Sequence, residues 1–528
     1  MFRRKLSTLS TTLAPDDRRL MVIKRDVSGG INTRMHASQI NANQCEELTN
    51  IDIGTPGQRR KRNGSVLIGS DVGSDTVVAL HDYQRQGYTD QLMMVEDTHL
   101  WASENEGEFI AVKNDFVADA DVGIVSVKES GLTPDDVIMV NVGEGNWFRF
   151  HKASGGTWDE DELSTANTSP PQSTVGCWYG NRFWVLKDDL LYYSDAYSAD
   201  YDGAFDQSTE WFRIPVGDER GIVPTRDKGM IIMGKNAIWN LFPSAVPAAT
   251  DRPEPIVSNH GVVSKKGWCV AGDNIYYFAQ DGFRELKRTA TDDLQTGTTY
   301  PLSYLLKDEF DEISWTYITN LSMVAFDNKI FINVPTGAST YSTWIYYPAL
   351  NSFSKLSDWN PRCMATHKID GELRLYYGKV ADGKVYRGWY GYTDEGTTTT
   401  NGTAIEMTEV GKEEDFGQPL IKKVGGEIEI EAETCGDGNS LTVYASVNGG
   451  SFDTSWTVSL TNSTAPTLPI NLPFFLADSY VIREKFSIDS LGEFRTLQVK
   501  VVNSNSNISD VILYSVNMIT FPQEYENE

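Results

Sequence analysis

Several features that would assign this 528-residue chain to a common class are scarce in its sequence. The five cysteines are scattered and form no Cys-x-x-Cys pair, which argues against a disulfide framework and against a zinc site. No apolar run approaches the roughly 20 residues that a membrane-spanning helix needs. The opening MFRRKLSTLSTTLA is positively charged but lacks the apolar core of a signal peptide. We therefore expect a protein made in a reducing cytoplasm, not exported by an N-terminal signal and without a membrane partner.

Basic charge is also scarce. The chain has 46 Lys and Arg against 73 Asp and Glu, which gives a formal net charge of −27. An acidic surface repels phosphates and anionic membranes at long range, so the charge argues against a protein that grips DNA. The negative charge is compatible with a channel through which DNA passes without binding. It is equally compatible with a surface charge that only keeps the protein soluble.

Catalytic motifs are absent. The sequence has no G-x-S-x-G and no H-E-x-x-H, and its six histidines are isolated from one another. The stretch from Gly229 to Asn236 approaches a phosphate-binding loop, but Asn236 stands where the motif needs Ser or Thr. The apolar residues between its glycines predict a buried strand instead. We expect no enzyme activity, no catalytic residue and no cofactor.

One loop is rich in carboxylates, with Asp195, Asp200, Asp202 and Asp206 close together around a glycine. Calcium takes six or more oxygen ligands, which clustered carboxylates can supply. The spacing matches no EF-hand, however. A metal-binding loop and a solvated connecting loop both fit this pattern, and we favour the connecting loop.

A pattern that does recur is an apolar run, a short turn and an aromatic run. The seven instances open near Leu92, Val137, Phe183, Met230, Trp268, Met323 and Leu373. Their average spacing is close to the ~40–50 residues of a four-stranded propeller blade. The turns contain Asp-Gly, Asp-Asn and Gly-Asn, which suit hairpins. We predict an all-β protein with a β-propeller of about seven blades, six to eight being compatible; two stacked sandwiches are the alternative.

Changes in composition divide the chain further. Residues 1–76 lack the hairpin pattern and are expected to form an N-terminal extension, in which Ser38 to Asn50 is the best helix candidate. Residues 77–392 are the predicted propeller. Residues 393–418 include a polar, turn-rich stretch and are expected to be a linker. Residues 419–528 contain alternating strands such as EIEIEAE and are predicted to form a C-terminal β-sandwich.

Four basic residues stand in a row in this acidic chain: Arg59, Arg60, Lys61 and Arg62. Adjacent charges in a turn usually face solvent. Alternatively, they pair with an acidic partner subunit or touch DNA phosphates. We take these four residues as a candidate subunit contact.

The stretch from Val27 to Ser65 resembles the opening of a family of tailed-phage virion proteins. In that family a Gly-Gly-aliphatic-Asn start leads to an Asn-rich helix, an Asn-aliphatic-Asp motif, a glycine turn and a basic pair before a final glycine. The matching residues here are Gly29, Gly30, Asn32, Asn50, Asp52, Gly57, Arg60, Arg62 and Gly64. Later stretches, from LLYYSD to LQVKVVNSNSNISDVILYSVNM, are similar in order. The resemblance covers roughly Val27 to Phe521 and depends on the order of the motifs.

The resemblance implies a tail nozzle or hub protein of a short-tailed phage, similar to tail tubular protein B. Such proteins are β-propellers in a hexameric ring around the DNA channel, below the portal and the adaptor. They contact the adaptor and the tail fibres or spikes, and they are not enzymes. We therefore expect a structural virion protein, assembled in the host cytoplasm, that retains genomic DNA and conducts it through a lumen during ejection without sequence-specific binding.

The family also includes longer members with inserted domains. The resemblance therefore does not specify which position in the tail this shorter chain occupies. The alternative function is a glycan-binding or glycan-cleaving propeller at the tail tip. It would require Asp or Glu side chains that converge with exposed Trp or Tyr in one cleft.

Overall fold

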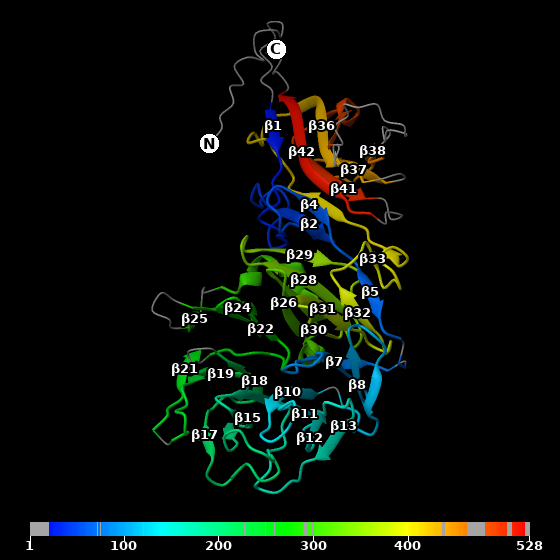
Figure 1. The fold of residues 1–528 in the computed structure, drawn as a ribbon. Helices are drawn as coiled ribbons and strands as arrows, with labels where there is room; N and C mark the ends of the chain where they lie inside the picture. Colours follow the sequence, from blue (N-terminus) through cyan, green and yellow to red (C-terminus); the bar gives the residue numbers. More distant parts are fainter. Residues whose placement is uncertain are drawn as a thin grey trace, which may run out of the picture. The chain divides into compact units, whose positions relative to one another are not determined.

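The computed structural model of the chain describes residues 21–522, apart from residues 71, 74, 120, 226–228, 249, 258, 289–293, 297–299, 436–438, 462–480 and 504–508. The regular secondary structure of the described residues is almost entirely β-strand, as the sequence predicted (Figure 1). They fall into two compact units. Residues Arg62–Ile405 form the propeller unit, and the described residues before Arg62 and after Ile405 form the sandwich unit.

The propeller unit contains six separate four-stranded antiparallel sheets, and strands β26–β29 form a further set of four. Each set is called a blade, numbered in chain order. Blades 1 to 3 are β6 (Val77–Tyr83), β7 (Gln91–Glu96), β8 (His99–Glu104) and β9 (Ile110–Lys113); β10 (Val122–Lys128), β11 (Asp136–Val142), β12 (Trp147–Lys152) and β13 (Trp158–Glu162); and β14 (Val175–Tyr179), β15 (Arg182–Lys187), β16 (Leu190–Tyr193) and β17 (Trp211–Arg213).

Blades 4 to 7 complete the set. They are β18 (Glu219–Pro224), β19 (Met230–Gly234), β20 (Ile238–Leu241) and β21 (Glu254–Val257); β22 (Trp268–Ala271), β23 (Asn274–Ala279), β24 (Gly282–Arg288) and β25 (Leu294–Thr296); β26 (Ser322–Phe326), β27 (Lys329–Pro335), β28 (Tyr341–Tyr347) and β29 (Ser352–Leu356); and β30 (Cys363–Ile369), β31 (Glu372–Gly378), β32 (Val385–Gly388) and β5 (Ser65–Ile68). Each of the seven predicted hairpins belongs to a different blade, and the number lies within the expected range.

The blades are buried on both faces because each packs between two others. Strand β19 shows this most clearly. Its residues Met230 and Ile232 belong to the apolar cluster shared with blade 3, whereas Ile231 and Met233 belong to the cluster shared with blade 5. Alternate side chains of a strand point to opposite faces, so a continuous apolar run fills both cores. The near match to a phosphate-binding loop is therefore a core strand.

The last blade is closed by a strand from the start of the unit. Strand β5 pairs antiparallel with β32, with Ser65 opposite Gly388 and Ile68 opposite Val385. Residues 62–76 thus belong with the propeller, whereas the sequence placed them in a separate extension. Closure of one sheet by both ends of the unit ties the first blade to the last.

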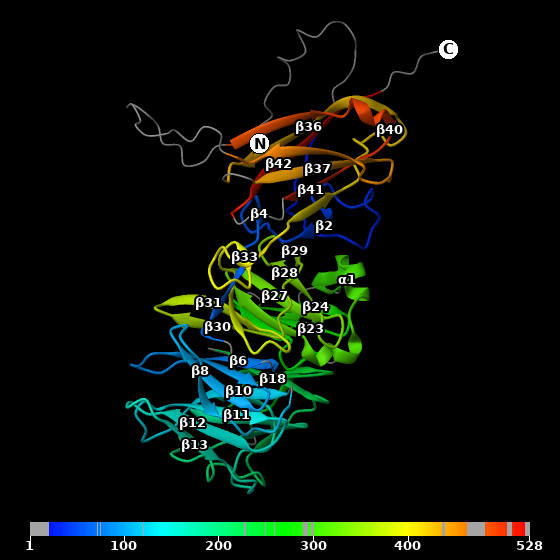
Figure 2. The same ribbon diagram turned by 90° about the vertical axis from the view of Figure 1, so that its right-hand side faces the viewer.

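Helices occupy little of the propeller unit. Between β25 and β26 lie the short segments η2 (Leu302–Leu305), α1 (Lys307–Asp311) and η3 (Trp315–Asn320). Figure 2 shows α1 at the side of the propeller unit away from β8. No helix in the described part of the chain has the length and apolar character that a membrane crossing needs.

The sandwich unit contains two groups of strands. One group follows the order β3 (Ile51–Asp52), β4 (Arg59–Lys61), β42 (Ile512–Pro522), β36 (Lys423–Glu433) and β39 (Val481–Ser487), with β1 (Met21–Lys24) on β42 and β40 (Glu493–Phe494) on β36. The other follows the order β2 (Cys45–Thr49), β35 (Thr408–Gly411), β41 (Leu497–Asn503), β37 (Ser440–Val447) and β38 (Thr454–Ser459). A short segment, η4 (Asp489–Leu491), precedes β40.

In this unit the predicted alternation holds. Along β36 the isoleucines and Ala432 are buried, while the glutamates between them are partly exposed. The predicted helix from Ser38 to Asn50 is wrong, because β2 occupies its second half and pairs with β35. The expected linker also contains structure: β33 (Thr393–Asp394) pairs with β34 (Thr403–Ala404), and β35 follows. The N-terminal strands thus join the C-terminal strands in one unit.

Candidate functional site

The first strands of blades 1, 2, 6 and 7 begin around a cavity of about 470 Å³ in the propeller unit. Its walls come from two kinds of position. One kind precedes or begins a first strand, and the other is the turn between a second and a third strand. The lining residues are Asp75, Thr76, Val78, Asp97, Ala118, Asp119, Asn320, Ala338, Arg362, Val380 and Ala381. The cavity therefore opens at the end of the propeller where the chain enters each blade.

Charge in this axial cavity is mixed. Asp75, Asp97 and Asp119 bring three carboxylates from three loops. The buried Arg362 donates hydrogen bonds to the carbonyl oxygen of Asn320 at 3.4 Å and to its side-chain oxygen at 2.9 Å. None of the described lining residues is a Trp or a Tyr. The cavity thus lacks the aromatic surface on which a sugar ring would stack.

Lys265 joins blades that are distant in the sequence at the same end of the propeller. It lies just before β22, and its amine donates to Asp121 Oδ2 at 2.6 Å and to Thr174 Oγ1 at 2.7 Å, which precede β10 and β14. It also pairs with Glu144 Oε1 at 3.2 Å. Burial opposes its charged form, but the hydrogen bond to Asp121 and the nearby carboxylates outweigh that effect and raise its pKa. Lys265 therefore links blade 5 to blades 2 and 3.

The next residue, Lys266, has a different environment. Its amine donates to the backbone carbonyl of Val78 in β6, and no carboxylate is paired with it among the described contacts. Burial, and then the charge of Arg362, lower the pKa of Lys266 to about 8. Lys265 and Lys266 together reach from blade 5 to blades 1, 2 and 3, so side chains bridge this end of the propeller. We call these two residues the lysine bridge.

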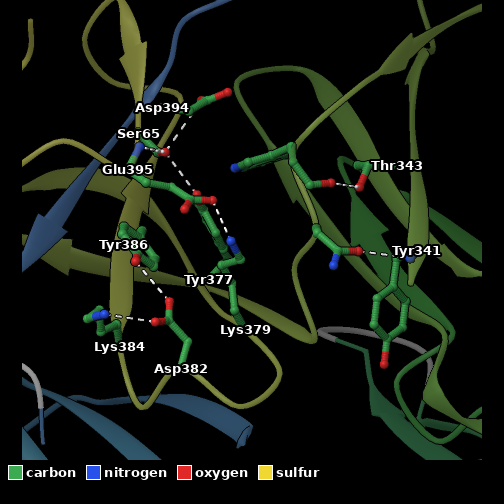
Figure 3. A network of polar contacts seen from close by, with 12 residues as sticks. Ser65, Tyr341, Thr343, Tyr377, Lys379, Asp382, Lys384, Tyr386, Asp394 and Glu395 are labelled. Carbon is green, nitrogen blue, oxygen red and sulfur yellow. Dashed lines mark hydrogen bonds and ion pairs between the residues drawn. The ribbon is translucent and has the colours of Figure 1, made fainter. Parts of the chain in front are cut away.

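A second polar network lies at the closing blade. Arg62 contacts both carboxylate oxygens of Asp394, at 2.8 and 2.6 Å, and both side chains are buried. Figure 3 shows Ser65 between Asp394, Glu395 and Tyr377. The Tyr377 hydroxyl donates to Ser65 Oγ at 2.8 Å, and the backbone N–H of Glu395 donates to the same oxygen at 3.0 Å. Burial, then the charge of Asp394, raise the pKa of Tyr377. This closing network fastens β5 to the hairpin that follows β32.

The four basic residues proposed as a subunit contact lie in β4 and just after it, not in an exposed turn. Arg59, Lys61 and Arg62 are buried. Arg59 pairs with Glu409 at 3.1 Å, whereas Arg60 is partly exposed and pairs with Asp510 at 2.5 Å. Arg59, Arg60 and Arg62 are thus paired with carboxylates of the same chain. The sequence interpretation missed the burial because the acidic partners lie far along the chain.

Three carboxylates of the aspartate-rich loop, those of Asp200, Asp202 and Asp206, accept hydrogen bonds within the chain. Asp202 accepts from the backbone N–H of Ser164 at 2.6 Å and from Ser169 Oγ at 2.7 Å. Asp200 accepts from the backbone N–H of Asp202, and Asp206 from Thr209 Oγ1 at 2.6 Å. Among the described residues, no group of three or more His, Cys, Asp or Glu is placed to hold a metal ion. The hydrogen bonds of Asp202 tie the loop to residues 164–169, which precede β14.

The lysine bridge was not found from the sequence. Two adjacent lysines resemble an ordinary solvated pair, and their acidic partners come from two other blades. The sequence signal that could have identified these lysines is their position directly before the apolar run that opens near Trp268. In a propeller, residues at the start of a blade lie near the central axis.

The fold and this site define an all-β propeller protein in which the lysine bridge connects blade 5 to blades 1, 2 and 3. The chain matches no protein-family model, and no curated protein matches it either.

Proposed function

We propose that this chain is a structural subunit of a ring, namely the nozzle or hub ring in the tail of a short-tailed phage. The observation that best supports this proposal is the lysine bridge in an acidic propeller. Side chains of blades 1, 2, 3 and 5 meet across one end of the propeller unit. A path for DNA then lies between copies of the chain rather than through the centre of each propeller.

The proposed mechanism is geometric and electrostatic. A net charge of −27 per chain gives a lumen whose walls do not compete with counterions for DNA phosphates. DNA can slide along such a wall because a wall of net negative charge does not attract its phosphates. The ring would be hexameric, with one kind of heterologous interface that closes by rotation. The adaptor above, the fibres or spikes at the side, and the virion location follow from the family resemblance. No catalytic role is proposed.

A glycan-binding propeller at the tail tip is the second candidate. The axial cavity offers three aspartates without Trp or Tyr among its described lining, which does not favour it. Exposed aromatic side chains do gather in the helical segment between blades 5 and 6: Tyr300, Tyr304, Trp315 and Tyr317. Exposed aromatic rings suit sugar stacking as well as protein contacts, so this segment is the feature that a glycan would use.

The deciding measurement is the mass of the protein in solution, alone and with the co-expressed tail adaptor, by light scattering. We expect a hexamer, or a ring that forms only when the adaptor is present. A monomer or trimer that ignores the adaptor would overturn the ring. Glycan array binding that is lost in Trp315→Ala would then support the second candidate.

A further inference from the structure

In the six separate four-stranded sheets of the propeller unit, the outer strand leaves one row of backbone groups without a strand partner in its own sheet. Proteins protect such edges with charged side chains or proline, because an unguarded edge pairs with other chains. In blade 2, residues 159–162 of β13 are four exposed acids. In blade 4, β21 exposes Glu254 and Pro255, and in blade 3 β17 exposes Arg213 next to a partly apolar position, Trp211. These three outer strands are guarded.

Strand β9, the outer strand of blade 1, differs from these three strands. It pairs with β8 through Ala102 opposite Ile110 and Trp101 opposite Ala111, and no other strand of the described residues pairs with it. Its exposed positions are Ile110, which is 64% exposed, and Ala111. Its single charged residue, Lys113, is buried and pairs with Asp115 and Glu160. The edge of β9 is therefore apolar and accessible.

The surroundings of β9 indicate what would fit it. Val117, a few residues further on, is 79% exposed and extends the apolar surface. Acidic side chains flank the strand, with exposed Glu108 before it and exposed Asp115 after it. Strand addition to an edge uses backbone hydrogen bonds for affinity and the neighbouring side chains for specificity. The fitting occupant is an extended segment with apolar and basic residues.

We propose that β9 accepts residues 1–20 of a second copy of this chain as an added strand. This segment lies outside the described residues, and it contains five basic and two acidic residues in a chain of net charge −27. Its Arg3, Arg4 and Lys5 complement the acidic flanks of β9. Residues 6–13, LSTLSTTL, contain no charge, glycine or proline and place leucines between hydroxyl side chains. They can therefore lie along an apolar edge.

The proposed contact spans two copies. Twenty extended residues reach at most roughly 66 Å, which sets the distance within which β9 of the second copy must lie. The contact rests on the self-assembly that the proposed function requires, and it supplies one heterologous interface for a ring.

A disulfide trap in the full chain tests the proposal. Ile110→Cys is combined in turn with Leu6→Cys, Leu9→Cys and Leu13→Cys, so that three registers are sampled. The matched control replaces Ile110→Cys with Val246→Cys, which is 73% exposed in blade 4. Single variants control for the native cysteines, of which Cys45, Cys177, Cys269 and Cys363 are buried.

We expect mild oxidation to link separate chains about a hundredfold faster with Ile110→Cys than with Val246→Cys, because docking raises the effective concentration of the two thiols. If Ile110→Cys and Val246→Cys cross-link at equal rates with each of the three partner cysteines, the proposal is overturned. A disulfide within one chain would overturn the second copy as the occupant. Ile110→Lys supplies an independent readout, since it should speed amide hydrogen exchange in β9 of the assembled protein.

The outcomes also separate this contact from the proposed function. A hexameric ring by light scattering with no preference for Ile110→Cys would refute the strand contact alone. Cross-linked chains without a ring of defined mass would refute the nozzle proposal while the contact stands.

Discussion

At the residue scale, the sandwich unit contains a cluster of buried charges. Glu409 is completely buried and accepts Arg25 at 2.6 Å and Arg59 at 3.1 Å. Arg25 also donates to the backbone carbonyl of Val499 at 3.1 Å. These contacts join β35 and β41 to Arg25 and Arg59. The single carboxylate of Glu409 therefore pairs with two buried guanidinium groups.

We predict that Glu409→Gln lowers the free energy of unfolding of the sandwich unit by about 3–5 kcal/mol, because it leaves two buried cations without their anion. Urea denaturation followed by tryptophan fluorescence measures the change. Glu427→Gln is the matched control. Glu427 lies on the partly exposed face of β36, 3.5 Å from Lys485, and its loss should cost about 0–1 kcal/mol. Equal effects of the two variants would contradict the prediction.

Lys266 gives the propeller unit a pH dependence. Its pKa in the folded protein is about 8, mainly because of burial, whereas the pKa of an unfolded lysine is about 10.4. Between these values the unfolded chain binds more protons than the folded chain. The free energy of unfolding therefore rises as the pH increases from about 8 to about 10.

We predict that Lys266→Met removes most of this rise and stabilises the propeller unit by about 1–2 kcal/mol at pH 7. Melting temperatures between pH 7 and pH 10 measure it. Lys307→Met, at an exposed lysine in α1, should leave the rise intact. Parallel pH profiles for Lys266→Met and the unchanged protein would refute the assignment.

The sequence identified the types of these residues but not their environments. The basic run at Arg59 to Arg62 was visible at once, yet its partners Glu409, Asp510 and Asp394 are more than 300 positions away. Burial and ion pairing are set by such distant contacts. Local composition therefore predicts that charges are present, and only the fold shows whether they face water.

At the scale of elements, local signals were sufficient for hairpins. A strand, a tight turn and a second strand are specified by neighbouring residues, and all seven predicted hairpins are present. The pairing of β5 with β32 could not be predicted in this way, because more than 300 residues separate the strands. The helix expected from Ser38 failed for a related reason. Its polar residues offered no apolar stripe, and pairing with β35 determined the conformation.

The closing network holds β5 in blade 7, so loss of the network should release β5 first. We predict that Asp394→Asn lowers the free energy of unfolding by about 2–4 kcal/mol, since the buried guanidinium of Arg62 loses its bidentate anion. Hydrogen exchange should then accelerate first in β5 and β32. Asp382→Asn is the control from the same region: Asp382 pairs with Lys384 at 2.9 Å near the surface. Exchange that accelerates equally in all blades would show that the closing network does not hold β5 specifically.

At the scale of the whole molecule, the sequence and the structure divide the chain differently. The composition indicated a propeller of residues 77–392, whereas the compact unit spans Arg62–Ile405. The additional residues are few, but they include β5, Arg62 and Asp394. They supply both sides of the closing network and the fourth strand of blade 7.

This difference leads to a prediction about fragments. Residues 62–405 should fold alone with a cooperative thermal transition, because every strand of the seven blades lies within them. A fragment of residues 77–392 leaves blade 7 with three strands and exposes the side of β32 that β5 covers. We expect it to melt at least about 10 °C lower, or to aggregate through the open edge. Circular dichroism and light scattering on the two fragments measure this. If residues 77–392 melt at the same temperature as residues 62–405, closure by β5 does not hold the ring of blades together, and the stability of the unit must come from blade-to-blade packing and the lysine bridge alone.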